Sequence, residues 1–136
     1  MSLKDYFENS RGTGVLSTAD AEGRVNSAVY ARPHVMEDGA IGFIMAERLS
    51  RQNLQSNPHA AYLFIEEGRG FRGKRLALTR LSESEDRELI ERLRRRTYSP
   101  ADEQRIGGLH LVLFKLDGER PLIGAGPEST DYPLGG

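Results

Sequence analysis

Apolar positions along this chain gather in six short segments, and their spacing predicts strands. Within these segments Val, Ile, Leu, Phe and Tyr alternate with polar residues or run together, which is typical of half-buried or fully buried strands. The segments are 15–18, 25–35, 40–46, 60–65, 74–81 and 109–114. Most of the chain is therefore expected to form a β-sheet.

Short turn sequences separate these segments at hairpin spacing. Asp20-Ala-Glu-Gly23 and Glu37-Asp-Gly39 each join two expected strands, and Asp117-Gly-Glu-Arg120 is expected to turn the last strand back. Pro33 lies inside segment 25–35, where a missing N–H favours an edge or a bulge. This arrangement predicts an antiparallel barrel.

Two stretches have helical periodicity instead. The apolar positions are Leu3, Tyr6 and Phe7 in the first stretch and Leu89, Ile90 and Leu93 in the second. They predict helices over 1–10 and 83–96, and Ser82 with Glu85 fits a capping box at the start of the second. We expect one domain over residues 1–136, with helices at the ends of the barrel and a loosely held tail at 124–136.

Composition narrows the classes of function. The chain has 136 residues, 38% hydrophobic and 29% charged, with a net charge of −1, which fits a soluble single domain and gives no general attraction to nucleic acid. The absence of cysteine excludes disulfides, thiolate catalysis and thiolate zinc sites. No apolar run approaches the ~20 residues of a membrane span, and no leader is recognisable, so a cytoplasmic location is the default expectation.

A polar segment at 48–57 carries the chemistry that is easiest to interpret. It follows the apolar segment 40–46 and holds Arg48, Ser50 and Arg51. Guanidinium groups give paired, charge-assisted hydrogen bonds to phosphate, and a short helix capped by Ser50 adds backbone N–H groups. The alternative is a solvated, capped turn with no ligand.

The order of several segments carries a resemblance to a known family. Arg24-Val-Asn-Ser-Ala-Val-Tyr-Ala-Arg32 follows the first hairpin turn, Phe43-Ile-Met-Ala46 leads into Leu49-Ser-Arg-Gln-Asn-Leu54, and Asn57-Pro58 precedes an apolar strand. Together these segments resemble the pyridoxamine 5′-phosphate oxidase-like family of split-barrel flavin-binding proteins, and most of all its short branch of small FMN-binding proteins.

The resemblance implies a mainly β fold, a six-stranded antiparallel split barrel with flanking helices, and a homodimer with FMN at its interface. The residues implied to hold the phosphate are Arg48, Leu49, Ser50, Arg51 and Asn53. Those implied to lie along the flavin ring are Asn26, Ser27, Ala28, Val29 and Tyr30, with Met45 and Ala46 near the ribityl chain and ring.

Residue chemistry is compatible with these roles. The amide of Asn26 and the hydroxyl of Ser27 suit the donors and acceptors on a flavin's O2, N3 and O4 edge, although both can equally be exposed strand residues. Apolar side chains such as Val29, Met45 and Tyr62 are expected to exclude water. A bound isoalloxazine carries hydride or electrons itself, so protein side chains need not do so.

Some positions depart from the larger oxidases of the family. Ser50-Arg-Gln52 stands where those enzymes have Ser-Arg-Lys, and Ala46 stands where they have threonine. The C-terminal Arg/His segment that binds pyridoxal in them is also not recognisable. The expected function is therefore an FMN-binding flavoprotein, an oxidoreductase or electron carrier. The alternatives are a non-enzymatic module for haem, a deazaflavin or no ligand, and a true pyridoxamine 5′-phosphate oxidase.

The remaining polar features have simpler explanations. His34 is expected on the surface of a strand, and His59 and His110 are too isolated to predict a metal site. The arginines at 92–96 suit a helix C-terminus rather than nucleic acid. The loop at 67–73 is either a plain hairpin loop or one that reaches the flavin of a partner subunit.

Overall fold

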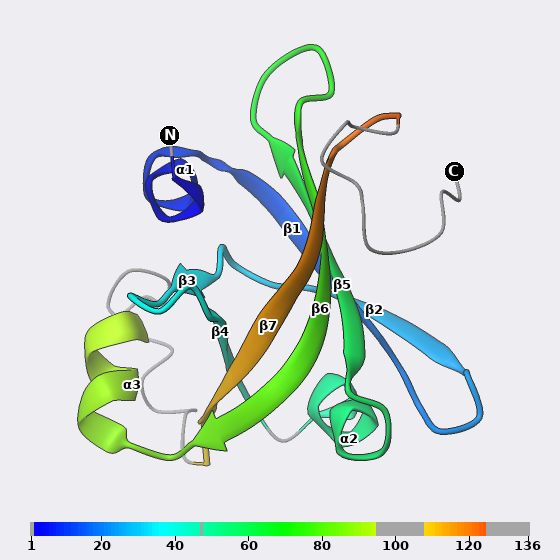
Figure 1. The fold of residues 1–136 in the computed structure, drawn as a ribbon, viewed down its shortest axis with the longest axis vertical. Coiled ribbons are helices and arrows are strands. Elements are labelled where there is room, and N and C mark those ends of the chain that lie inside the picture. The colour runs from blue at the N-terminus through cyan, green and yellow to red at the C-terminus, as the bar shows by residue number, and fades with distance from the viewer. Residues whose placement is uncertain (1, 47, 95–107, 125–136) are drawn as a thin grey trace.

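Residues 2–46, 48–94 and 108–124 are described by a computed structural model, and in them the chain forms one curved antiparallel sheet with three helices (Figure 1). The strands are β1 (Gly12–Ala19), β2 (Val25–Val29), β3 (His34–Val35), β4 (Ile41–Met45), β5 (His59–Glu66), β6 (Gly73–Ser84) and β7 (His110–Pro121). The helices are α1 (Leu3–Asn9), α2 (Leu49–Ser56) and α3 (Arg87–Arg94). The strand order is β2-β1-β5-β6-β7-β4-β3, which confirms the expected mainly β, antiparallel class.

The second expected strand is in fact two strands, which raises the strand count in the described residues from six to seven. β2 pairs with β1 at one edge of the sheet, and β3 pairs with β4 at the other. Residues 30–33 connect them, so the sheet must curl until its edges approach. Pro33 lies in this crossover, where its missing N–H removes no ladder bond.

Tyr62 on β5 holds the crossover from inside the barrel. Its hydroxyl donates to the backbone carbonyls of Tyr30 and Ala31, at 3.2 Å each. Gly14 makes room for this contact, because a Cβ there would lie 1.8 Å from the Tyr62 oxygen. Burial raises the pKa of the Tyr62 hydroxyl, which keeps it a donor.

Aromatic side chains fill the barrel, and α1 covers the end nearest to β3. Phe7 of α1 is buried and meets Phe64 edge-to-face at 5.4 Å between ring centroids. The Phe43 ring lies 4.9 Å from the Tyr62 ring, with the two planes tilted by 55°. Arg32 of the crossover donates to the carbonyls of Phe7 and Ser10, both at 2.7 Å, so α1 is fixed to the crossover as well as to the core.

Strand β6 is longer than the sequence predicts, and the helix after it starts later. Residues 82–84 pair with residues 111–113 of β7, so the expected helix start at 83 is wrong and α3 begins at Arg87. The capping box of Ser82 and Glu85 is wrong too, because Asp86 accepts from the N–H of Leu89 at 3.2 Å. The part of the expected helix beyond residue 94 lies outside the described residues.

Strand β7 also continues through its expected turn at 117–120. The register shifts between Ala77 and Leu78, so that Asp117 is an extra residue in a β-bulge. Ladder pairing with β6 resumes at Gly118 and runs to Pro121. The bulge absorbs the Asp-Gly pair that suggested a turn. The predicted tail from residue 125 onward lies outside the described residues.

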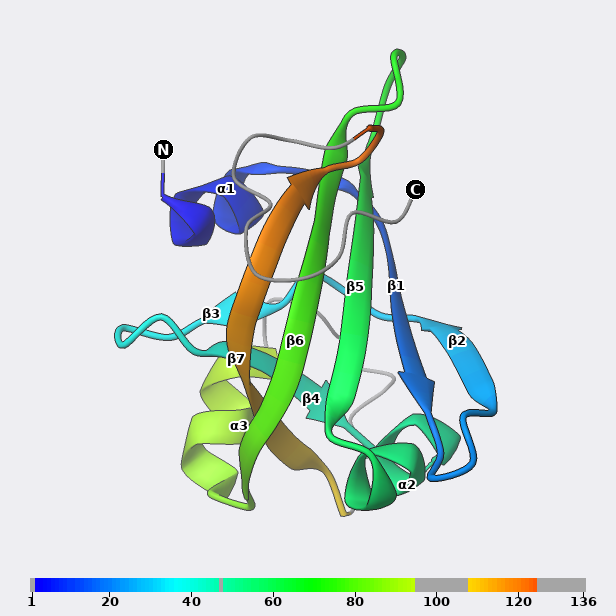
Figure 2. The ribbon, with the colours of Figure 1, turned by 45° about the vertical axis from the view of Figure 1, so that its right-hand side comes forward.

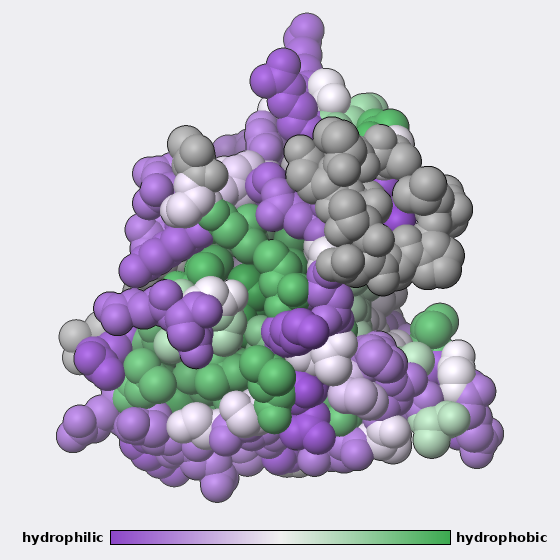
Figure 3. Space-filling model, viewed as in Figure 1, coloured by the Kyte–Doolittle hydropathy of each residue, from purple (hydrophilic) through white to green (hydrophobic). Residues whose placement is uncertain are grey.

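Helix α3 packs on a second, smaller apolar cluster. Ile90 contacts Ile44 and Leu111 there, and apolar residues gather between α1 and α3 on the face that Figure 3 shows. None of the helices in the described residues is long and apolar enough to cross a membrane.

Candidate functional site

Helix α2 lies across the lower end of the barrel, beside β1 and β2 (Figure 2). It begins after Arg48, whose backbone is extended. Ser50, Asn53 and Leu54 share one face and are buried. Leu54 enters the main core, while the two polar side chains meet polar partners instead.

These partners form what we call the polar junction, made of Thr18, Asn26, Ser50 and Asn53. Thr18 and Asn26 are paired across β1 and β2. Asn53 Nδ2 donates to Thr18 Oγ1 at 3.1 Å, and Asn26 Nδ2 donates to Ser50 Oγ at 3.4 Å. The structure therefore brings Asn26 and Ser50 together. The Asn53 amide is instead hydrogen-bonded to the buried Thr18 hydroxyl.

The first turn of α2 has the donor set that a phosphate group needs. Its N-cap residue, Arg48, makes no side-chain hydrogen bond to the turn, and no acidic residue lies in it. First-turn N–H groups lack helical acceptors, and the positive end of the helix dipole favours an anion. Arg48 and Leu49 are exposed beside this turn, so the residues present fit a phosphate.

Arg51 points away from that turn, toward strand β6. Its Nη2 and Nε lie 2.7 and 3.2 Å from Glu83 Oε1, and the two side chains are 17% and 16% exposed. Burial raises the pKa of Glu83, but hydrogen bonds from Arg51 and Gln55 outweigh it and hold the pKa of this carboxyl below its ordinary value. The Arg51 guanidinium is thus engaged with a charged carboxylate.

The predicted ring-contacting residues, four on β2 and Tyr30 just after it, divide between two faces of the sheet. Successive strand side chains point to opposite faces, so Asn26, Ala28 and Tyr30 are half-buried while Ser27 and Val29 are exposed. Tyr30 packs on the Phe43 ring at 6.0 Å. The five side chains therefore do not form one flat surface.

Other predicted residues lie in or near the core. Met45 and Tyr62 are fully buried among apolar side chains, and Ala46 is half-buried just after β4. His34 is buried rather than on the surface, which corrects the expectation. It lines a cavity of about 240 Å³ together with Lys4 and Leu93, away from the polar junction.

A groove on the side of the sheet away from the core has no counterpart in the sequence predictions. It holds about 520 Å³ and is lined by His59, Thr79, Lys115 and Asp117, with Ala77 among its apolar residues. Thr79 Oγ1 donates to Asp117 and lies 3.3 Å from His59 Nδ1. Asp117 is the extra residue of the β7 bulge and accepts from Thr79 on the neighbouring strand, a contact that no local sequence signal predicts.

The groove continues the surface that carries the exposed residues of β2. Ser27, Ser17, Ala61 and Ala77 form one row across β2, β1, β5 and β6. Because side chains alternate along a strand, Thr79 shares their face. This row of small residues defines what we call the outer face.

Comparisons with known proteins identify the fold. No protein-family model matches the chain, and no curated protein matches it. An FMN-binding protein from Syntrophomonas wolfei subsp. wolfei has a similar structure, with a TM-score of 0.72 and 16% identity over 90% of this chain and 85% of that one.

Two further solved structures share the fold. HutZ, the haem storage protein from Vibrio cholerae, has a TM-score of 0.63 and 24% identity, covering 85% of this chain and 89% of its own. A structure described as an F420 reductase has a TM-score of 0.61 and 16% identity, covering 88% and 97%. At these identities the likeness establishes the fold: the chain is an antiparallel split barrel of the kind that these proteins share.

Proposed function

We propose that the protein binds FMN with its phosphate at the first turn of α2, and that it is a flavoprotein with a redox function. The observation that carries the proposal is the meeting of Ser50 with Asn26 beside an uncapped helix start. An FMN-binding protein among the solved structures of the same fold supports it.

Each residue at the turn has a distinct task in this proposal. Arg48 supplies a positive charge, and Ser50 with the first-turn N–H groups supplies hydrogen bonds to phosphate oxygens. Leu49, which is 52% exposed, covers the neighbouring ribityl chain. Asn53 and Arg51 hold the helix through Thr18 and Glu83.

The flavin ring is proposed to lie along β2. This strand is at an edge of the sheet in the described residues, and edge strands present unpaired N–H and C=O groups. Such groups, with the half-buried side chain of Asn26 that reaches Ser50, match the donors and acceptors of the ring's pyrimidine edge. Ser27 lies on the opposite face of the strand, where its hydroxyl pairs with that of Ser17. When bound, the isoalloxazine supplies hydride or electron transfer, and the protein binds and orients it.

We propose a homodimer formed through the outer face. Val25 and Val29 are 79% and 76% exposed beside the row of small residues, and one sheet edge offers only one wall to a planar ligand. A second copy related by a two-fold axis would supply the other wall and create two equivalent sites.

The alternative ligands are a deazaflavin and haem. These two ligands stay as alternatives because an F420 reductase and a haem storage protein are among the structural neighbours. A true pyridoxamine 5′-phosphate oxidase is a third candidate. A cytoplasmic location remains our proposal.

An absorbance spectrum of the freshly purified protein, followed by mass identification of any released ligand, tests these candidates. We expect flavin bands in the blue and near ultraviolet that bleach on reduction, and an FMN mass. A colourless protein that gains no flavin bands with added FMN contradicts the proposal. A haem band or a deazaflavin mass selects the corresponding alternative, and turnover of pyridoxamine 5′-phosphate with oxygen selects the third.

A further inference from the structure

We infer that Glu83 positions the phosphate-binding turn of α2. Arg51 contributes to phosphate binding by holding the helix against Glu83, and it does not contact the phosphate itself. The inference rests on the proposed function, since it concerns the same turn of α2. It assigns a role in ligand binding to a strand residue that lies 32 positions away from Arg51 in the sequence.

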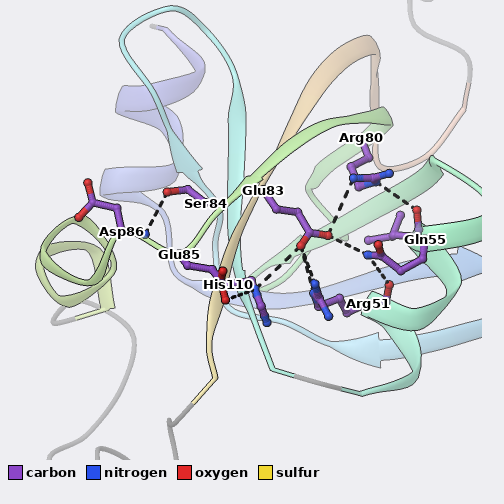
Figure 4. A network of polar contacts seen from close by, with 9 residues as sticks. Arg51, Gln55, Arg80, Glu83, Ser84, Glu85, Asp86 and His110 are labelled. Atoms are coloured by element: carbon purple, nitrogen blue, oxygen red, sulfur yellow. Dashed lines mark hydrogen bonds and ion pairs between the residues drawn. The ribbon is translucent and has the colours of Figure 1, made fainter.

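One carboxylate holds two successive turns of α2 (Figure 4). Arg51 donates to Glu83 Oε1, and Gln55, one turn later, donates to Glu83 Oε2 at 2.8 Å. Residues four apart lie on the same side of a helix. Both oxygens of Glu83 are therefore committed to the same face of α2, and the contact fixes the helix along its length.

Arg80, three residues before Glu83, fastens the end of the same helix. Its Nε donates to the carbonyl of Leu54 at 3.1 Å, and its N–H donates to the carbonyl of Pro58 at 2.8 Å. Its guanidinium also lies 3.9 Å from Glu83. Strand β6 thus contacts α2 through both charged side chains.

We call the contacts of Glu83 with Arg51 and Gln55 the clamp. The clamp and the polar junction contact different sides of α2. Ser50 faces Asn26 on β2, whereas Arg51, about 100° further round the helix, faces Glu83 on β6. Contacts at two such angles prevent the helix from rotating about its axis. They thereby set the direction in which the first-turn N–H groups point, and binding of a phosphate depends on that direction.

Affinities for FMN and for riboflavin, which lacks the phosphate, test the inference. We expect the unmodified protein to prefer FMN. Glu83→Ala and Arg51→Ala should each lower the ratio of the two affinities about tenfold, the scale of one charge-assisted hydrogen bond. The double variant should lose no more than either single variant, because both changes break the same clamp.

Two controls separate positioning from bulk charge and from general stability. Glu85→Ala removes the same charge from an exposed neighbour and should leave the ratio unchanged. Hydrogen exchange of α2 amides without ligand should accelerate in both Glu83→Ala and Arg51→Ala. If either alanine variant fails to fold, Glu83→Gln and Arg51→Lys replace them, with the same direction and a smaller loss.

The outcomes distinguish the two proposals. A higher ratio in Glu83→Ala would mean that freed Arg51 binds the phosphate directly, and it overturns the inference while leaving FMN binding intact. A lower ratio in Arg51→Ala with an unchanged ratio in Glu83→Ala would also overturn the inference and leave FMN binding intact. If the unmodified protein shows no preference for FMN over riboflavin, the proposed function fails and the inference fails with it.

Discussion

Helices α1 and α2 cover different ends of the barrel, and they are attached by different kinds of contact (Figure 2). α1 inserts Phe7 among aromatic rings, and its polar attachments are the bonds from Arg32 to its backbone carbonyls and from Tyr6 to Glu66. α2 inserts Leu54 but adds the polar junction and the Glu83 clamp. Apolar burial is strong and non-directional, whereas hydrogen bonds depend on angle. We infer that the buried aromatic contact of α1 contributes more to stability, whereas the polar side chains of α2 itself set the orientation of that helix.

The largest expected effect is at the α1 end. Phe7→Ala should lower the free energy of unfolding by about 3–5 kcal/mol, the usual cost of removing a buried aromatic side chain. Denaturant titration measures it. Where the variant remains folded, its FMN affinity should match that of the unmodified protein, and a selective loss of FMN binding would break the comparison.

A smaller loss of stability is expected at the polar junction, together with a loss of binding. Asn53→Ala leaves the buried Thr18 hydroxyl without its donor, which should cost about 1–3 kcal/mol. It should also weaken FMN binding in a calorimetric titration. Adding Thr18→Val to this variant removes the hydroxyl that has lost its donor. The double variant should recover part of the stability but not the affinity for FMN. Full recovery of both would count against a role of Asn53 in orienting α2.

The decrease of the free energy of unfolding at alkaline pH should depend in part on Tyr6 of α1. Burial, then the hydrogen bond to Glu66, raises the pKa of Tyr6 above its ordinary value of 10.0. The unfolded chain therefore loses this proton first, and stability should fall as the pH rises above about 10. Tyr6→Phe should make this decrease shallower in denaturant titrations at a series of pH values, leaving the part due to Tyr62, whose pKa burial also raises. An unchanged slope would exclude Tyr6 as a source of it.

The acid limb should report on the α2 end, with the smallest effect of the four. Because the pKa of Glu83 is lowered in the folded protein, its contribution is complete above the unfolded value of 4.5 and is lost as the pH falls through the folded value. Glu83→Gln should reduce the acid slope. Equal slopes for Glu83→Gln and the unmodified protein would mean that another carboxyl dominates.

Periodicity was sufficient for the elements that depend on local pattern. Leu3, Tyr6 and Phe7 predicted α1 because a helical apolar face needs only neighbouring residues. The strand class followed from alternation in the same way. The pattern of segment 25–35 predicts one strand, because alternation does not reveal that its two halves pair at opposite edges of a sheet.

Long-range pairing decided the elements that were mispredicted. Residues 82–84 are polar and resemble a helix cap, but they pair with the apolar residues 111–113 of β7 and so extend strand β6. At the candidate site, residue type alone predicts that Arg51 meets a negatively charged group. That this group is Glu83 does not follow from the sequence, because nothing between the two residues indicates which strand packs against α2.

The crossover between β2 and β3 has a consequence for how a ligand enters and leaves. Residues 30–33 tie the two margins of the sheet together, and four residues span at most about 14 Å. The barrel therefore cannot unroll to admit a flavin, and its interior is already filled with aromatic rings. A flavin at α2, in the dimer that we propose, would therefore enter and leave sideways, over the rim of the barrel. Its exchange rate would follow separation of the two subunits rather than opening of the sheet.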